Sequence, residues 1–315
     1  MEKKLRWGVL GNAWIARDFM IPALENSDIC DLAAVASRSK VPEDLAPNAR
    51  HYDNYEALLN DPNIDAIYVP VPNALHMAWT IKALEAGKHV LCEKPLACTA
   101  EEGEKMITAA EKNGVLLMEA FMYRYGAKFQ KMMEIISSGV LGKIMTMQGS
   151  HGYTLDWASP AREDPKLGGG SLYDVGCYVV DCMNAIMDAQ GAKLQDASAA
   201  LRMKNGVDWH ATAWLRYDND VIGALQCWFD AASEQRMLIA GEKGTLIVPH
   251  IFEGSGGEMY LTIGGQTQTI TVDNIDPYQL EAEAFACTLL GGNDERMPLC
   301  DSIRNLKTLE VLYKK

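Results

Sequence analysis

The chain has 315 residues, of which 48% are hydrophobic and 23% charged, and its formal net charge is −13 at pH 7. This length predicts two domains, or one domain with a large insertion, and the composition is typical of a folded globular protein. Because an acidic surface repels nucleic acid and anionic membranes, we expect neither as a partner.

Short apolar strands alternate with amphipathic helices in the first part of the chain. We expect strands at residues 5–11, 31–38, 64–72, 88–93 and 115–124, and helices at 14–26, 55–60, 74–87 and 99–114. Thr99 with Glu102 three residues later has the spacing of a capping box, which supports a helix start there. Strands that alternate with helices predict a parallel sheet with crossover helices, in a first domain over residues 1–124.

The pattern changes after about residue 128 to longer alternating strands joined by short turns. These strands are expected at residues 143–153, 196–205, 209–218, 221–230, 235–248, 258–265 and 266–272. Strands in series predict a mainly antiparallel sheet, so residues 125–300 form a second, α+β domain that also holds a helix at 172–189. Two more helices begin near residues 278 and 301, and we expect the last, about 301–315, to pack back on the first domain.

A turn of small residues follows the first strand. It reads Gly11-Asn12-Ala13-Trp14-Ile15-Ala16, a G-x-A-x-x-A form of the dinucleotide fingerprint. The first small residue permits a tight turn, the second lets the backbone approach a pyrophosphate, and the third lets helix and strand pack closely. The motif also fits an ordinary strand–helix turn. Its place in the first βα unit favours cofactor binding by residues 11–15, at a helix start whose free N–H groups attract an anion.

The second strand ends in Ser37-Arg38-Ser39-Lys40. An NAD site usually places Asp or Glu here to bind the ribose 2′-hydroxyl. Arg38 is instead suited to a bidentate pair with a 2′-phosphate, so Ser37 and Arg38 predict NADP, with NAD as the alternative cofactor. The other interpretation is a solvated basic loop without a specific function.

Lys94 follows an apolar run directly and is itself followed by Pro95. In open α/β sheets, ligands bind at the carboxyl ends of the strands, which is where Lys94 is expected. Pro95 disfavours a helical conformation at Lys94 and permits a cis peptide bond. A surface lysine at a strand end is the competing interpretation.

The stretch "GGGSLYDVGCYVVD" leads three glycines into a helix. Asp174, Tyr178 and Asp181 fall at i, i+4 and i+7, so they share one helix face. A tyrosine between two acids suggests chemistry, although an exposed polar face is the alternative. A phenol has a pKa of about 10, and an ammonium about 4 Å away contributes at most roughly 4 kcal/mol, or about three pKa units. Lys94 would therefore make Tyr178 an effective general acid and base for carbonyl reduction.

Together with "YVPVPNALH", "CEKPLA" and "EAFMYR", these motifs resemble the Gfo/Idh/MocA family of NAD(P)-dependent oxidoreductases, over nearly the whole chain. Many branches of the family have histidine where this chain has Tyr178, and the tyrosine makes the chain most similar to the branch of sugar and dihydrodiol dehydrogenases. The resemblance implies a Rossmann domain followed by an open sheet that binds substrate. Ala13 departs from the commoner glycine, and Tyr125-Gly126 departs from the aromatic and histidine of related members.

The resemblance also implies roles for individual residues. Lys94 and Tyr178 match the catalytic pair, and Asp174 matches an aspartate near the substrate. The residues implied at the cofactor are Pro70, Asn73, His76 and Glu93, the last beside the nicotinamide ribose. Members are usually dimers or tetramers, often through the outer face of the open sheet, so we expect a homodimer or homotetramer.

The leading hypothesis is an NADP-dependent dehydrogenase or reductase of a sugar, polyol or cyclic diol. Arg124, Tyr153 and Trp157 would then contact the carbohydrate-like substrate, with Trp157 either stacked on a sugar ring or serving as a loop anchor. A glycoside hydrolase that uses a tightly held nicotinamide is one alternative, although such relatives generally show Gly-Gly-His in this region. The other alternative is a non-enzymatic NADP-binding sensor, which would need the glycine turn but not Lys94 with Tyr178.

The eight cysteines and six histidines are scattered along the sequence, and no two cysteines form a C-x-x-C pair. We therefore expect reduced thiols and no zinc or iron site. The sequence "MEKKLRWGVLG" lacks the apolar stretch of a signal peptide, and no run of about 18 apolar residues is present. A cytoplasmic location is the expectation.

Overall fold

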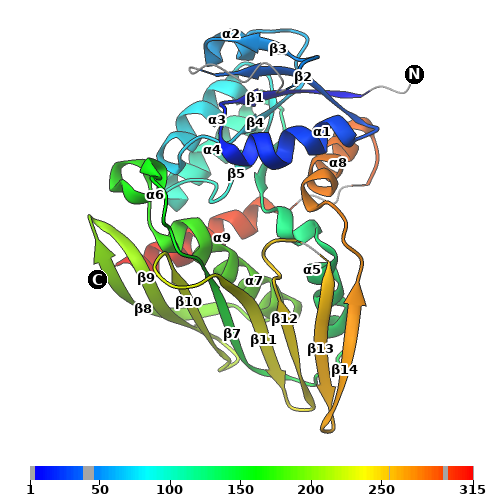
Figure 1. The fold of residues 1–315 in the computed structure, drawn as a ribbon, viewed down its shortest axis with the longest axis vertical. Helices are drawn as coiled ribbons and strands as arrows, with labels where there is room; N and C mark the ends of the chain where they lie inside the picture. The colour runs from blue at the N-terminus through cyan, green and yellow to red at the C-terminus, as the bar shows by residue number, and fades with distance from the viewer. Residues whose placement is uncertain (1–3, 38–45, 255, 294–296, 315) are drawn as a thin grey trace. The chain divides into compact units, whose positions relative to one another are not determined.

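The computed structural model describes residues 4–37, 46–254, 256–293 and 297–314 (Figure 1). The chain divides into two compact units. The first comprises Met1–Met122 and Tyr278–Ile303, and the second comprises Tyr123–Pro277 and Arg304–Lys315. The chain thus leaves the first unit once, returns to it late, and ends in the second.

The first unit is built on a six-stranded sheet in the order β3-β2-β1-β4-β5-β6, in which every neighbouring pair is parallel. Its strands are β1 (Leu5–Leu10), β2 (Cys30–Ala36), β3 (Arg50–Tyr52), β4 (Ala66–Val69), β5 (His89–Glu93) and β6 (Leu117–Ala120). This is the strand order of dinucleotide-binding sheets. The predicted parallel sheet is confirmed, and β3 is a short edge strand that the sequence pattern did not indicate.

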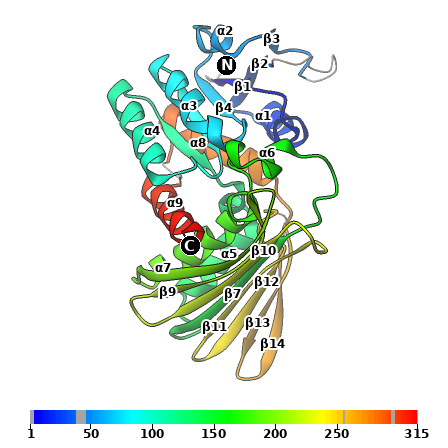
Figure 2. The ribbon, with the colours of Figure 1, turned by 90° about the vertical axis from the view of Figure 1, so that its left-hand side faces the viewer.

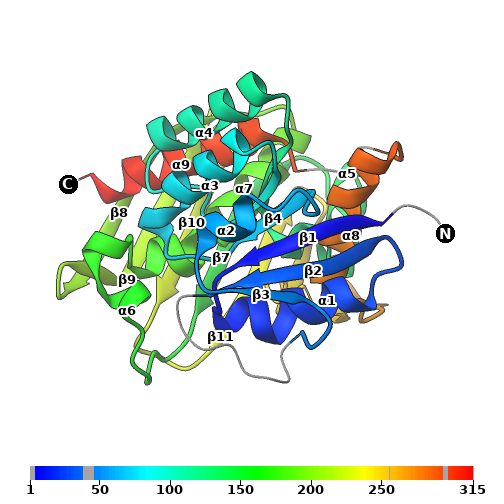
Figure 3. The same cartoon turned by 90° about the horizontal axis from the view of Figure 1, so that it is seen from above.

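Helices cover both faces of this sheet. They are α1 (Ile21–Asn26) after a π-helical turn at Ala16–Met20, α2 (Tyr55–Leu59), α3 (His76–Glu85) after a 3₁₀ turn at Asn73–Leu75, α4 (Ala100–Asn113) and α8 (Pro277–Leu290). Helices α3 and α4 pack together on one face, and α1 and α8 lie on the other (Figure 3). The ring centroids of Phe285 in α8 and Trp7 in β1 are 5.0 Å apart, which places α8 directly on the sheet.

The start of α4 has the predicted capping arrangement. The Thr99 hydroxyl accepts from the Glu102 N–H at 3.2 Å, and Glu102 Oε2 accepts from the Cys98 N–H at 3.0 Å. The first bond satisfies a backbone donor that the first helical turn leaves open, and the second holds the residue just before the cap. The cap therefore ends the segment after Lys94 and begins α4 at a defined residue.

The second unit contains an eight-stranded sheet in the order β14-β13-β12-β11-β7-β10-β9-β8. Its strands are β7 (Ile144–Gly152), β8 (Leu194–Lys204), β9 (Val207–Tyr217), β10 (Ile222–Trp228), β11 (Glu234–Gly241), β12 (Gly244–Pro249), β13 (Gly257–Ile263) and β14 (Gln266–Val272). All neighbouring pairs are antiparallel except β7 with β10, which are parallel. The predicted mainly antiparallel sheet is confirmed.

Helices α5 (Ala127–Ser137) and α7 (Cys177–Ala189) pack on one face of this sheet (Figure 2). A π-helical turn at Leu172–Gly176 precedes α7, and the short helix α6 (Pro160–Glu163) and the part of α9 (Leu299–Tyr313) from Arg304 onward also belong to this unit, with 3₁₀ turns at Met122–Tyr125 and Pro165–Leu167. Every side chain from Cys177 to Met187 is buried, so α7 is the central helix of this unit. It carries Tyr178 and Asp181 into the interior.

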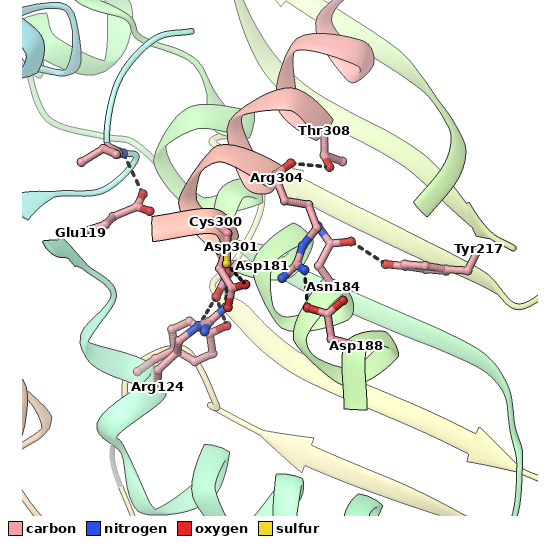
Figure 4. Close-up of polar contacts among 12 residues, drawn as sticks. Glu119, Arg124, Asp181, Asn184, Asp188, Tyr217, Cys300, Asp301, Arg304 and Thr308 are labelled. Atoms are coloured by element: carbon pink, nitrogen blue, oxygen red, sulfur yellow. Dashed lines mark hydrogen bonds and ion pairs between the residues drawn. The ribbon is translucent and has the colours of Figure 1, made fainter. Parts of the chain in front are cut away.

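The two C-terminal helices divide differently from the sequence-based boundaries. Helix α8 was expected in the second domain, but from Tyr278 onward it belongs to the first unit. The final helix is divided between the units: residues 299–303 belong to the first, and residues from Arg304 onward belong to the second, where Arg304 pairs with Asp188 of α7 (Figure 4). Its expected packing on the first domain stays a prediction. The apolar stripe of a helix shows that one face is buried, but not which sheet receives it.

Within the described ranges, no helix combines the length and apolar character needed to cross a bilayer. The same residues contain no group of three His, Cys, Asp or Glu side chains arranged to hold a metal ion.

Candidate functional site

The turn after β1 has the backbone shape that the small-residue motif predicts. Gly11 has a φ of +110°, which side chains other than glycine rarely adopt, and its N–H donates to Ala36 O at 2.7 Å. The carbonyl of Ala13 accepts from Ala16 and Arg17, so the helix begins at once. Asn12 Oδ1 is buried without a hydrogen-bond partner among the described residues. A bend, a helix start and an open polar atom together fit a bound dinucleotide.

Ser37 directly follows β2, where its N–H donates to Tyr52 O at 2.9 Å and its side chain is buried. Arg38 lies outside the described residues. Its predicted role in selecting NADP therefore stays a prediction from the sequence. Trp14 and Ile15 lie at the start of the helix after Gly11, and the Trp14 ring is 45% exposed.

Lys94 follows β5 at the carboxyl edge of the parallel sheet. The preceding Glu93 is buried, its Oε1 accepts from Tyr68 Oη at 2.5 Å, and its Oε2 accepts from the Lys94 N–H at 3.2 Å. The Lys94–Pro95 peptide bond is cis, which answers a question that the sequence left open. The backbone that carries Lys94 is thus held from both sides of the residue.

His76 supports the same segment from α3. Its two ring nitrogens lie 2.9 Å from Pro95 O and 2.8 Å from Val71 O. Burial lowers the pKa of His76 to about 4, against the opposite effect of these carbonyls, so the ring is neutral at pH 7 and donates one of the two bonds. Pro70 lies buried directly after β4, and Asn73 begins the 3₁₀ turn before α3. Contact of these residues with a dinucleotide stays a prediction.

Three buried carboxyl groups lie near Lys94 in the first unit, and the sequence analysis identified only one of them, Glu93. Glu119 Oε1 accepts from the Leu96 N–H at 2.7 Å (Figure 4). Glu281 of α8 is fully buried, and neither carboxyl oxygen has a hydrogen-bond partner among the described residues. Burial, followed by the charges of Glu93 and Glu119, raises the pKa of Glu281 well above its ordinary value and so favours the protonated acid. The sequence signal that could have identified Glu119 is its position as a lone acid within an apolar run.

In the second unit, Asp174 is the centre of a polar cluster. Its Oδ2 accepts from Tyr153 Oη at 2.6 Å and from Arg162 Nε at 2.9 Å. Burial, followed by the Asp174 charge, raises the pKa of Tyr153, which keeps its hydroxyl protonated as a donor. Tyr153 and Asp174 were both predicted as site residues, and the structure brings them together. Arg162 was not predicted, since a lone arginine in the short helix α6 has no distinctive pattern.

Two of the three glycines before this helix have a packing reason. A Cβ on Gly169 would lie 2.4 Å from Arg162 O, and a Cβ on Gly170, whose φ is +115°, would lie 2.1 Å from Asp208 Oδ1. The Gly170 N–H donates to Arg162 O at 3.0 Å. The two glycines therefore let α6, which carries Arg162, lie against the segment that carries Asp174.

Tyr178 lies in a nest of aromatic rings. The ring centroids of His151, Tyr123 and Phe252 are 5.3, 5.6 and 5.9 Å from its own. The side chain is buried, with 8% of its surface exposed. Contacts on several sides of the ring restrict displacement of the side chain and thereby limit movement of its hydroxyl.

Arg124 has a different partner from the predicted substrate. Its Nε and Nη2 donate to the two oxygens of Asp181 at 2.8 and 2.6 Å, and Asp181 Oδ2 also accepts from Tyr123 (Figure 4). Asp181 is almost fully buried. Asp174 in the π-helical turn and Asp181 in α7 thus serve two separate clusters on either side of Tyr178, and substrate contact by Arg124 stays a prediction.

Trp157 stacks on Tyr153, with ring centroids 5.6 Å apart and planes at 9°, while 51% of its surface is exposed. One face is therefore anchored and the other is open. Because Lys94 belongs to the first unit and Tyr178, Asp174 and Trp157 to the second, joint action of these residues is a prediction.

Comparisons with known proteins agree with these two units. Residues 5–121 match the family model described as "Oxidoreductase family, NAD-binding Rossmann fold", and residues 129–247 match the "GFO/IDH/MocA C-terminal domain". The chain is 34% identical to D-xylose 1-dehydrogenase (NADP(+)) 2 of Haloferax volcanii, over 98% of this chain and 97% of the relative. It is 28% identical to trans-1,2-dihydrobenzene-1,2-diol dehydrogenase of Xenopus laevis, over 94% and 93%.

Among solved structures, the chain is similar to KijD10, a 3-ketoreductase from Actinomadura kijaniata in complex with NADP and TDP-benzene. The TM-score is 0.90 at 27% sequence identity, and the match covers 98% of this chain and 97% of KijD10. Both units of the fold are therefore shared with this reductase.

Proposed function

The chain belongs to the Gfo/Idh/MocA oxidoreductase family, and from this membership we propose that it transfers a hydride between NADP and a secondary alcohol or carbonyl of a sugar, polyol or cyclic diol. The observation that carries the substrate class is the cluster of Tyr153, Arg162 and Asp174 beside the half-exposed ring of Trp157. Polar groups of this kind bind hydroxyls, and an aromatic face suits the apolar face of a sugar ring. The names of the relatives from Haloferax and Xenopus support a sugar or a diol.

NADP is proposed as the cofactor for two reasons. The Haloferax relative is named for NADP(+), and the KijD10 structure contains NADP. In this chain, Arg38 follows β2 where an NAD site usually has an acid, and a guanidinium pairs well with a 2′-phosphate. The conformation of Gly11 fits the pyrophosphate turn.

The proposed mechanism gives each residue a defined task. Bound NADP supplies or accepts the hydride. Tyr178 delivers a proton to the developing alkoxide, or removes it in the reverse direction, as a general acid or base. The Lys94 ammonium lowers the phenol pKa and hydrogen-bonds the reacting oxygen. Asp174 accepts from a substrate hydroxyl and so orients the sugar.

Self-association through the outer face of the second sheet is proposed as well. Trp214 of β9 lies beside Ala224 of β10, which lies beside Gln148 of β7, and all three are exposed. Ile222 and Met145 add exposed apolar surface on the same strands. Light scattering should give a dimer or tetramer for the wild type and a smaller species for Trp214→Glu, whereas a wild-type monomer would rule the proposal out.

The activity is tested by following NADP(H) absorbance over a panel of aldoses, inositols, dihydrodiols and dicarbonyls, with NAD(H) in parallel. Turnover of at least one polyol or hydroxycarbonyl with NADP(H) is the expected result. Tight NADPH binding without turnover of any compound would favour a sensor. Release of a chromogenic aglycone without net cofactor turnover would favour a glycoside hydrolase.

A further inference from the structure

We propose that Arg162 is a positioning residue that holds Asp174 as an oriented acceptor for a substrate hydroxyl, and that this contact selects substrates with a hydroxyl next to the reacting carbon. The proposal rests on the proposed function and adds a determinant of specificity to the same site. It stands on the geometry of Arg162, Asp174 and Tyr153 within the second unit.

Two donors converge on one oxygen of Asp174. Arg162 Nε lies 2.9 Å from Oδ2 and Tyr153 Oη lies 2.6 Å from the same atom. A carboxylate held by two donors cannot rotate without losing both, so its orientation is fixed. Bonds to an ionised acceptor are also stronger than neutral ones, which makes this arrangement costly to disturb.

The Arg162 side chain is itself held in place. Its Nη1 lies 3.2 Å from Ser159 Oγ, and its carbonyl accepts from the Gly170 N–H at 3.0 Å. The second contact ties the arginine backbone to the segment four residues before Asp174. Arg162 is therefore fixed at both its backbone and its guanidinium before any substrate binds.

The cluster is partly desolvated but not sealed from solvent. The side chains of Arg162 and Asp174 are 18% and 15% exposed. Burial opposes the charge on Arg162, but Asp174 and Tyr153 raise the pKa of Arg162 above its ordinary value, so the guanidinium stays charged. A charge pair at this depth interacts more strongly than a surface pair and remains within reach of a small solute.

The position of Asp174 along the helix links it to the reaction. Asp174 and Tyr178 are four residues apart and share a helix face. If Tyr178 serves the reacting oxygen, the carboxylate one turn away serves a neighbouring oxygen of the same substrate. A vicinal diol or a hydroxycarbonyl supplies two such oxygens, whereas a simple alcohol or ketone supplies one.

The experiment compares hydroxylated substrates with their deoxy analogues. In the wild type, kcat/KM for a hydroxycarbonyl from the active panel should exceed that for the analogue without the neighbouring hydroxyl by about tenfold to a hundredfold. Arg162→Gln should reduce this ratio at least about tenfold, mainly through KM of the hydroxylated substrate, and should leave the deoxy analogue nearly unchanged.

Two further variants separate positioning from folding. Tyr153→Phe removes only a hydroxyl, so it should shift the ratio in the same direction even where Arg162→Gln folds poorly. Arg236→Gln removes an exposed arginine that pairs with Glu234 in the same unit, and it should leave the ratio unchanged. NADPH binding, followed by its fluorescence, should be retained in all three variants.

The outcomes separate this proposal from the proposed function. A wild type that turns over nothing in the panel removes the proposed function and this inference with it. An active wild type whose selectivity survives Arg162→Gln and Tyr153→Phe overturns the role of Arg162 alone. Equal losses on hydroxylated and deoxy substrates would assign Arg162 to general structure and would also overturn the proposal.

Discussion

The ring of Tyr123 packs against the ring of Tyr178, with centroids 5.6 Å apart. Tyr123 Oη also donates to Asp181, which lies three residues after Tyr178 on α7. One side chain thus contacts the proposed catalytic ring and is bonded to the helix that carries it. Burial, followed by the charge of Asp181, raises the pKa of Tyr123 well above its ordinary value, so the hydroxyl remains a donor.

The Tyr123–Asp181–Arg124 cluster predicts two different losses of stability. Tyr123→Phe removes one hydrogen bond to a charged group while Arg124 still pairs with Asp181, so the free energy of unfolding should fall by about 1.5–3 kcal/mol. Arg124→Met leaves the buried Asp181 carboxylate without its cation and should cost about 3–5 kcal/mol. Urea denaturation measures both values.

Lys131→Met is the matched control, because it removes a cation that pairs with Glu134 on the surface of α5. Its cost should be about 0–1 kcal/mol. Equal costs for Arg124→Met and Lys131→Met would contradict the buried character of the first pair.

Lys94→Ala and Tyr178→Phe should each lower kcat about 10²–10⁴-fold, since proton transfer by a positioned group contributes that much. NADPH binding should survive Tyr178→Phe, because the phenol acts on the substrate in this mechanism. Stopped-flow absorbance on the best substrate of the panel measures the chemical step. Tyr260→Phe, which removes an exposed hydroxyl bonded to Glu258, is the control. Unchanged kcat in both variants would reject the acid–base pair.

Local patterns predicted both sheets, but long-range packing decided what the patterns missed. Strand–helix alternation and period-two strands are properties of short segments, so they survive in a single sequence. The helix at Pro277–Leu290 was expected in the second domain but belongs to the first unit from Tyr278 onward, because an apolar face does not specify its acceptor. The turns at Ala16–Met20 and Leu172–Gly176 are π-helical, whereas the sequence predicted ordinary helix over these residues.

The candidate site shows the same limit. The pattern around Asp174 and Tyr178 was readable because both lie on one helix in a glycine-rich context. Glu281 lies far along the chain from Glu93 and Glu119, and nothing in the sequence around Arg162 or Glu281 marks either residue. Arg124 was assigned to substrate, whereas in the fold its guanidinium is bound to Asp181.

Gly170→Ala should lower the stability of the second unit through two effects, backbone strain and a steric clash of the new Cβ. At a φ of +115° any side chain is strained, and the new Cβ would lie 2.1 Å from Asp208 Oδ1. The free energy of unfolding should fall by at least about 2–4 kcal/mol, as the sum of strain and overpacking. Gly139→Ala is the control, since its φ is +72° and nothing lies within 4 Å of the added Cβ. Equal losses in the two variants would mean that the collision is relieved.

Arg38→Ala should shift cofactor preference toward NAD. A bidentate pair with the 2′-phosphate is worth about tenfold to a hundredfold in affinity, so KM for NADP should rise by that factor while KM for NAD stays within about twofold. Steady-state kinetics with both cofactors measures the ratio. An equal loss for both cofactors would show that Arg38 does not recognise the phosphate.

Glu281 predicts a pH dependence of stability with a definite sign. Because its pKa is raised from an ordinary value of 4.5, the folded chain holds a proton that the unfolded chain releases above about pH 4.5. The contribution of Glu281 to stability is therefore complete below pH 4.5 and declines as pH rises, by about 1.4 kcal/mol per pH unit, until the folded group also ionises. Glu281→Gln resembles the protonated acid and has no such decline.

From pH 5 to pH 8, the unfolding free energy of Glu281→Gln should therefore increase relative to that of the wild type. Denaturant curves at each pH measure it, with the exposed Glu111→Gln of α4 as the control for a lost surface charge. Parallel curves for wild type and Glu281→Gln would mean that Glu281 is ionised in the fold. In that case Glu281 would add a negative charge beside those of Glu93 and Glu119. The electrostatic potential at Lys94, one residue from Glu93, would then be more negative than with a protonated Glu281.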